Sequence, residues 1–195
     1  PAAPTQPARD PADVVSVFAS VYSEIAGTDF NPNWGQTNNH PNNMTTPLYG
    51  GDEVKQYQNT GGYQGTRIGQ DIDVSVINKL HVDIYSPTLT SLRLFLIKTT
   101  GGAFETSVTI PLTPGEWTSV NINVNETTFP GLDLTLIREI KYDQFKIGAA
   151  LTNNQIFAID NFYFYREIGT APSLGEFTVP AAVLGDAPFA LTPPS

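Results

Sequence analysis

The chain of 195 residues carries 10 Lys and Arg against 19 Asp and Glu, which gives it a formal net charge of −9 at pH 7. It contains no cysteine, which excludes disulfides, thiolate metal sites and cysteine nucleophiles. The sequence has no basic stripe and no apolar run of the roughly 20 residues that span a bilayer. We therefore expect no nucleic-acid partner and no membrane partner.

Glycine and proline are frequent, at 16 residues each, and aromatic residues reach 11% while charged residues make up only 15%. This composition is typical of strands joined by tight turns, so the sequence predicts an all-β fold, an antiparallel β-sandwich. Clusters of Gly, Pro or Asn separate the strand-like segments, which are Val14–Tyr22, Val54–Gln58, Gly65–Asp71, Lys79–Tyr85, Ser91–Lys98, Phe104–Leu112, Thr118–Val124, Ile137–Phe145 and Ile156–Arg166.

The first 13 residues, PAAPTQPARDPAD, contain four prolines and no periodic apolar pattern, as in an extended, polyproline-like linker. A strand is predicted from Val14 onward, although the apolar spacing there would also suit a helix. The strand is favoured because four residues of this segment are valine, which is β-branched. After the linker we expect one β domain, residues 14–167.

The segment KLHVDIY alternates cleanly, with Leu80, Val82 and Ile84 on one face and His81 and Asp83 on the other. One face is therefore core, and the other is wet or covered by a ligand. We interpret His81 as a hydrogen-bonded surface residue rather than as a ligand-binding group.

The last strand, IFAIDNFYFYRE, places Asp160 in line with Phe162 and Phe164 if it alternates strictly. A carboxylate among core phenylalanines would lose its hydration, and a hard cation with oxygen ligands would offset that cost. The alternative is that Asp160 lies at the edge of the sandwich and accepts backbone hydrogen bonds. Alternation alone does not decide between the two.

The string AIDNFYFY, preceded by GEWTSVNINV and GLDLTLIREIKYD, resembles the end of the jelly-roll carbohydrate-binding modules of secreted bacterial polysaccharide-degrading enzymes. DVVSVFASVYSEIAGTDFNPNWGQ, GGYQGTRI and KLHVDIYSP extend the resemblance over about Val14 to Glu167. The resemblance implies a jelly roll without catalytic activity, secreted or at the surface of a bacterium.

In families four, sixteen and twenty-two of these modules, the last strand carries an aspartate that binds a structural calcium ion. Asp160 matches that position. The resemblance therefore implies calcium at Asp160, with Ser16 and Asp52 as further ligands and Ser20 or Glu53 as alternatives to them.

Sugar recognition needs aromatic rings that pack on the flat C–H faces of pyranoses, and planar polar groups that bind their hydroxyls. Given the resemblance, we predict sugar contacts from Trp34, Gln36, Tyr57, Tyr63, Gln64 and Arg67. The alternative for Trp34 is a structural plug that closes the sandwich under a long loop. Trp117 follows a Pro-Gly turn and is interpreted as structural.

Residues 168–195 are rich in Pro, Ala and Gly, which predicts a linker and the truncated start of a separate unit. The string FTVPAAVLGDAPFALTPPS resembles the opening of the MBG-like immunoglobulin-type repeats of large bacterial surface and secreted proteins. We therefore expect tethered catalytic or surface domains in the same parent chain, and a monomer.

Enzymatic interpretations find little support in the residue inventory. The chain has only two histidines, no serine in a nucleophile elbow, and no closely spaced carboxylate pair on one strand of the kind that jelly-roll hydrolases use. The sequence thus predicts a non-catalytic module that targets a larger secreted protein to a polysaccharide. The net charge of −9 favours a neutral β-glycan. The alternatives are an adhesion or spacer domain without sugar binding, and a divergent hydrolase or lyase.

Overall fold

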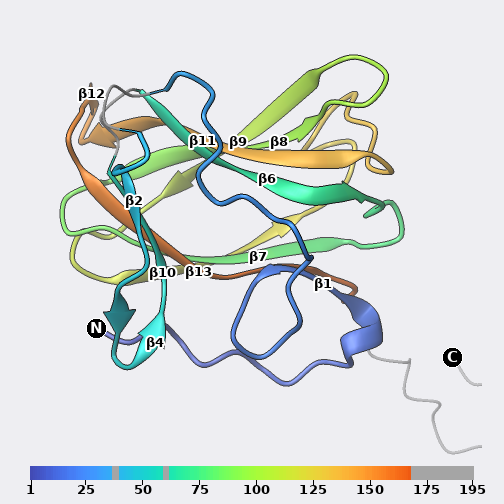
Figure 1. Ribbon diagram of the computed structural model, residues 1–195, viewed down its shortest axis with the longest axis horizontal. Helices are drawn as coiled ribbons and strands as arrows, with labels where there is room; N and C mark the ends of the chain where they lie inside the picture. The colour runs from blue at the N-terminus through green and yellow to red at the C-terminus, as the bar shows by residue number, and fades with distance from the viewer. Residues whose placement is uncertain (37–39, 59–61, 168–195) are drawn as a thin grey trace, which may run out of the picture.

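Two antiparallel sheets pack face to face in the computed structural model, which describes residues 1–36, 40–58 and 62–167 (Figure 1). The first sheet has the strand order β10-β7-β13-β5-β2, and β1 also pairs with β13. The second has the order β12-β11-β8-β9, and β6 also pairs with β11. Within the described residues no helix is long and apolar enough to cross a bilayer.

Each of the nine predicted segments corresponds to a strand, whereas the two-residue strands β2, β3, β4 and β12 lie outside these segments. The first sheet is built from β1 (Val14–Phe18), β2 (Met44–Thr45), β5 (Lys55–Gln58), β7 (Lys79–Tyr85), β10 (Trp117–Asn123) and β13 (Ile156–Tyr165). The second is built from β6 (Tyr63–Ile72), β8 (Ser91–Lys98), β9 (Phe104–Pro111), β11 (Ile137–Ile147) and β12 (Ala150–Leu151). A hairpin of β3 (Leu48–Tyr49) and β4 (Asp52–Glu53) and a single 3₁₀ turn, η1 (Pro11–Asp13), complete the described elements.

One apolar core lies between the sheets, as the alternation of the strands requires. From β7, Leu80, Val82 and Ile84 are fully buried, and they belong to the same core cluster as the inward leucines of β8. The all-β sandwich is therefore confirmed. The first strand ends earlier than predicted, at Phe18, because the chain turns where the amide of Tyr22 donates to the carbonyl of Ala19.

A β-bulge in β13 changes which face Asp160 occupies. The register between β13 and β7 shifts between Asp160 and Tyr163, and Asn161 adopts the left-handed conformation with φ of 50°. The extra residue puts Phe162 and Phe164 in the core but leaves Asp160 on the outward side, as bulges do. The prediction that Asp160 shares a face with these phenylalanines is wrong, because it assumed strict alternation.

The outward side of the first sheet is covered by the chain itself. Residues 1–13, predicted as a linker, run along this sheet from the N-terminus to η1 at the blue end of the colour scale (Figure 1). His81 is consequently only 5% exposed and Asp83 is fully buried, although both point away from the core. The interpretation of His81 as a surface residue is therefore wrong. The predicted linker and immunoglobulin-like start at residues 168–195 lie outside the described residues.

Candidate functional site

The outward side chains of the second sheet form a single polar face, which we call the Trp34 face. Strand pairing aligns them in rows across β6, β11, β8 and β9, and the register of each pair fixes which residues are neighbours. The face consists of Tyr63, Gly65, Arg67, Glu139, Lys141, Asp143, Arg93, Phe95, Ile97, Glu105, Ser107 and Thr109 from the strands, and Trp34 from the loop above β6.

Ion pairs across neighbouring strands fix the charged groups of the Trp34 face. Arg67 Nε lies 2.7 Å from Glu139 Oε1, and Lys141 Nζ lies 2.6 Å from Glu105 Oε1. Arg93 donates two hydrogen bonds to Asp143, at 2.8 and 2.9 Å, which raises the pKa of the Arg93 guanidinium. These ion pairs fix the orientation of the charged side chains in the ligand-free protein.

Trp34 lies on the outward side of β6, packed against a glycine. A Cβ atom on Gly65 would come within 2.2 Å of Cζ3 and 2.4 Å of Cη2 of the indole, so only glycine permits this approach. The Tyr63 hydroxyl donates to the Trp34 carbonyl at 3.0 Å, and the Trp34 amide donates to Gln36 Oε1 at 2.7 Å. The half-buried indole therefore belongs to the outer face and not to the core.

A hollow of about 400 Å³ lies at one end of this face. It is lined by Arg67, Asp71, Thr99, Thr100, Arg138 and Glu139. The Thr100 hydroxyl donates to Asp71 Oδ2 at 2.6 Å, so part of the wall is preordered. Guanidinium, carboxylate and hydroxyl groups here can donate to or accept from a polyhydroxylated ligand.

Three of the predicted sugar-contacting residues are buried. Tyr57 is fully buried and stacks on Phe157 with ring centres 5.2 Å apart, so its prediction as a sugar contact is wrong. Gln64 is fully buried and Gln36 is 2% exposed, which removes both from direct contact as well. Gln64 alternates inward between Tyr63 and Gly65, and Gln36 holds the loop by donating to the Pro32 carbonyl at 2.7 Å.

The predicted metal ligands lie on the other sheet. Asp160 is fully buried; its Oδ1 accepts from the Asn161 amide at 2.6 Å, whereas Oδ2 has no hydrogen-bond partner in the described part of the chain. Burial, with smaller contributions from the charges of Asp52 and Asp83, raises the pKa of Asp160 to about 7. Asp52 in turn accepts from the Ser20 hydroxyl at 3.3 Å.

No hydrogen bond between described residues joins the Ser16 hydroxyl to Asp160 or Asp52. This hydroxyl is buried and unpartnered there, but Ser16 lines a separate pocket with Val21 and Tyr22. Glu53 pairs with Lys55 at 2.6 Å. No group of three or more His, Cys, Asp and Glu placed to hold a metal ion occurs in residues 1–36, 40–58 and 62–167. A cation at Asp160 would therefore depend on backbone carbonyls and water for most of its ligands.

Comparison with known sequences gives no match, either to a protein-family model or to a curated protein. Solved structures do match. The family 30 carbohydrate-binding module of a cellulosomal cellulase of Clostridium thermocellum aligns with a TM-score of 0.58 at 14% identity, over 80% of this chain and 99% of that one. Another family 30 carbohydrate-binding module aligns with a TM-score of 0.56 at 13% identity, over 83% and 93%. The chain has the fold of a carbohydrate-binding module.

The match confirms the predicted jelly roll, and at these identities it bears on the fold alone. A family 11 carbohydrate-binding module from Clostridium thermocellum is 22% identical over 63% of this chain and 82% of that one, with a TM-score of 0.44. The predicted likeness to families four, sixteen and twenty-two, and the immunoglobulin-like repeat, stay predictions.

Sequence reasoning missed most of the charged members of the Trp34 face. Glu139, Lys141 and Asp143 alternate outward in the segment IREIKYD, opposite the buried Ile140 and Tyr142. The same period-two rule applied to the segment YQGTRI would have selected Tyr63 and Arg67 and excluded Gln64.

Replacing Gly65 by alanine is expected to lower the free energy of unfolding by about 1–3 kcal/mol, because the added methyl collides with the Trp34 ring and with the Ile140 carbonyl at 2.5 Å. Urea unfolding measures the loss, and tryptophan fluorescence reports the displaced indole. Ser107→Ala, on the same face but on β9, is the control and should be close to neutral. An unchanged fluorescence spectrum in the alanine variant would contradict this packing.

Proposed function

We propose that the chain is a non-catalytic carbohydrate-binding module that targets a larger secreted or surface-attached protein to a polysaccharide. The observation that carries the proposal is the position of Trp34, Tyr63 and Arg67 on one outward face beside a polar hollow. The solved modules with TM-scores above 0.5 share the sandwich on which this face is built.

Recognition at the Trp34 face would combine an apolar ring with fixed polar groups. The indole provides a surface for a sugar C–H face, and the paired Arg67 and Glu139 provide a donor and an acceptor for neighbouring hydroxyls. Affinity should be modest, because a shallow face buries little area and exchanges sugar–water hydrogen bonds for similar ones. A tethered partner would still gain from the raised local concentration.

A neutral β-glycan is the proposed ligand. The net charge of −9 disfavours uronate-rich or sulfated chains. On the Trp34 face, the carboxylates of Glu139, Asp143 and Glu105 are each paired with an Arg or Lys side chain. The same pairing argues against the hydrolase alternative, which needs one carboxyl group that protonates a leaving oxygen. The spacer alternative treats Trp34 as a plug, whereas the indole lies on the outward side of β6.

We also propose a structural calcium ion at Asp160, with Asp52 as the second carboxylate. The support is the buried, unpartnered Oδ2 of Asp160 and the negative charge of Asp52, which contributes to raising the pKa of Asp160. Bound calcium would offset the hydration that the ionised carboxylate of Asp160 loses on burial.

Affinity electrophoresis against β-glucans, xylans, mannans and algal galactans tests the proposed binding. Retardation by at least one neutral polysaccharide is expected. If none of these polymers retards the chain, the spacer alternative replaces the binding module.

Arg67→Ala is expected to weaken binding to the retarding polysaccharide by about 3- to 10-fold, since one charged hydrogen-bond partner contributes on the order of 1 kcal/mol. Arg166→Ala is the matched control, because Arg166 also forms an ion pair, with Asp13, but lies at the end of β13 in the other sheet. Equal losses in both variants would show that the effect does not come from the Trp34 face.

A further inference from the structure

Within the first nine residues, every third backbone carbonyl accepts a hydrogen bond from a side chain of the sandwich. The carbonyl of Pro1 accepts from Trp117 Nε1 at 3.0 Å, and the carbonyl of Pro4 accepts from Asn161 Nδ2 at 3.2 Å. The carbonyl of Pro7 accepts a longer bond from the Tyr22 hydroxyl at 3.5 Å. The donors come from β10, from β13 and from the turn after β1, so the segment crosses the sheet.

This spacing matches the intrinsic conformation of the segment. Proline fixes its own φ near −65°, and the residues before proline, Ala3 and Gln6, are restricted to extended conformations. A polyproline helix has three residues per turn, so the carbonyls of Pro1, Pro4 and Pro7 point to the same side. Little conformational entropy is then lost on docking, because the segment is already extended before it binds.

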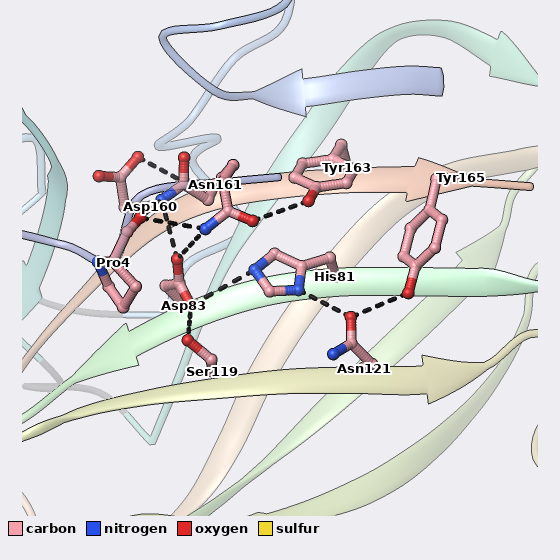
Figure 2. A network of polar contacts seen from close by, with 10 residues as sticks. Pro4, His81, Asp83, Ser119, Asn121, Asp160, Asn161, Tyr163 and Tyr165 are labelled. Atoms are coloured by element: carbon pink, nitrogen blue, oxygen red, sulfur yellow. Dashed lines mark hydrogen bonds and ion pairs between the residues drawn. The ribbon is translucent and has the colours of Figure 1, made fainter. Parts of the chain in front are cut away.

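Gln6 anchors the segment to buried polar groups. Its Nε2 donates to Asp83 Oδ2 at 2.8 Å, and its Oε1 accepts from the Tyr163 hydroxyl at 2.7 Å. Asp83 also accepts from Asn161 Nδ2 at 2.8 Å and from the Ser119 hydroxyl, in the network that Figure 2 shows. An amide side chain carries both a donor and an acceptor, so Gln6 donates to the carboxylate and accepts from the phenol at once.

Aromatic rings lie at both ends of the docked segment. Trp117 contacts Tyr49 and Tyr85, with ring centres 6.0 and 5.6 Å away, at the Pro1 end. At the other end the guanidinium carbon of Arg9 lies 3.6 Å from the centre of the Tyr165 ring. Aromatic side chains with hydrogen-bond donors aimed at carbonyls are the usual means by which proteins recognise proline-rich peptides.

We propose that the outward face of the first sheet is a recognition site for a proline-rich segment of the form Pro-x-x-Pro-x-Gln-Pro-x-Arg, and that its occupant is this chain's own residues 1–9. Gln6 is the specificity-determining residue, because its side chain bonds both the fully buried Asp83 and the Tyr163 hydroxyl. The site lies on the sheet opposite to the Trp34 face and does not depend on sugar binding.

Limited trypsin digestion of the full chain tests the docking. Arg9 is the first basic residue of the sequence, so cleavage after it reports release of the segment. Gln6→Ala is expected to speed this cleavage about tenfold, because local opening no longer breaks the hydrogen bonds of Gln6 to Asp83 and Tyr163. Thr5→Ala, at an exposed position next to the anchor, is the control and should cleave at the original rate. Equal cleavage rates in all three proteins would overturn the proposal.

Recognition in trans is measured by calorimetry with the full-length Gln6→Ala variant and a synthetic peptide of residues 1–9. Saturable binding is expected, together with at least tenfold weaker binding of the same peptide carrying Gln6→Ala. Absence of binding would overturn the recognition site. A concentration-dependent dimer in gel filtration, with the segment exchanged between two copies, would overturn the assignment of the occupant to the same chain.

Discussion

Replacing Trp34 by alanine is expected to abolish retardation by the polysaccharide that the original chain binds. Aromatic side chains that a ligand covers contribute on the order of 2 kcal/mol or more to binding. Removing one therefore lowers the affinity about 30-fold. For a module of modest affinity this loss exceeds the range of affinity electrophoresis. The indole matters more than its polar neighbours because it supplies the large apolar surface above β6.

The matched control for this variant is Trp117→Phe. Trp117 is the other tryptophan of the chain and lies on the first sheet, opposite to the Trp34 face. The substitution should lower stability slightly, through loss of the Nε1 bond to Pro1, and leave retardation unchanged. Far-ultraviolet circular dichroism of both variants separates loss of binding from loss of fold. Full retardation of a folded Trp34→Ala variant would refute the Trp34 face as the sugar site.

The strands could be predicted because their periodicity is local. The bounds of β7 and β8 match the predicted segments at both ends, since alternation and flanking turn residues define them without reference to the rest of the chain. The bulge at Asn161 could not be predicted in this way. Nothing in the spacing of IFAIDNFYFY distinguishes one extra residue from strict alternation.

The site was predictable only where it follows strand parity. Tyr63 and Arg67 share the outward side of β6, as a period of two requires, and the same period places Gln64 on the buried side. The position of Trp34 depends on a contact with Gly65 across 31 residues of sequence, although a glycine inside a strand is a signal of such close approach. The cover over His81 and Asp83 comes from residues 1–9, whose proline content indicates an extended chain but not where it docks.

Asp160→Asn is expected to stabilise the protein in chelator at pH 7.5 and to remove its response to calcium. The pKa of Asp160 in the folded protein is about 7, above its ordinary value of 3.8, so between these pH values the folded state holds a proton that the unfolded state has lost. In chelator the contribution of Asp160 to stability is therefore greatest at low pH and is lost as pH rises through about 7. The slope is at most about 1.4 kcal/mol per pH unit.

Calcium should reverse this dependence, because a cation beside Asp160 favours the ionised carboxylate and binds the folded state alone. At a calcium concentration 100 times the dissociation constant the gain is about 2.7 kcal/mol, and it should diminish as the pH falls below 7. Melting temperatures with calcium and with chelator, at pH 5 and pH 7.5, measure both effects. Asp133→Asn is the control, because Asp133 is a half-buried carboxylate in the loop before β11, in the other sheet, and it should keep the full response. An equal calcium response in Asp160→Asn and in the original chain would place the ion elsewhere. No response in either protein would contradict the calcium site, and Asp160 would then avoid a buried charge by holding a proton.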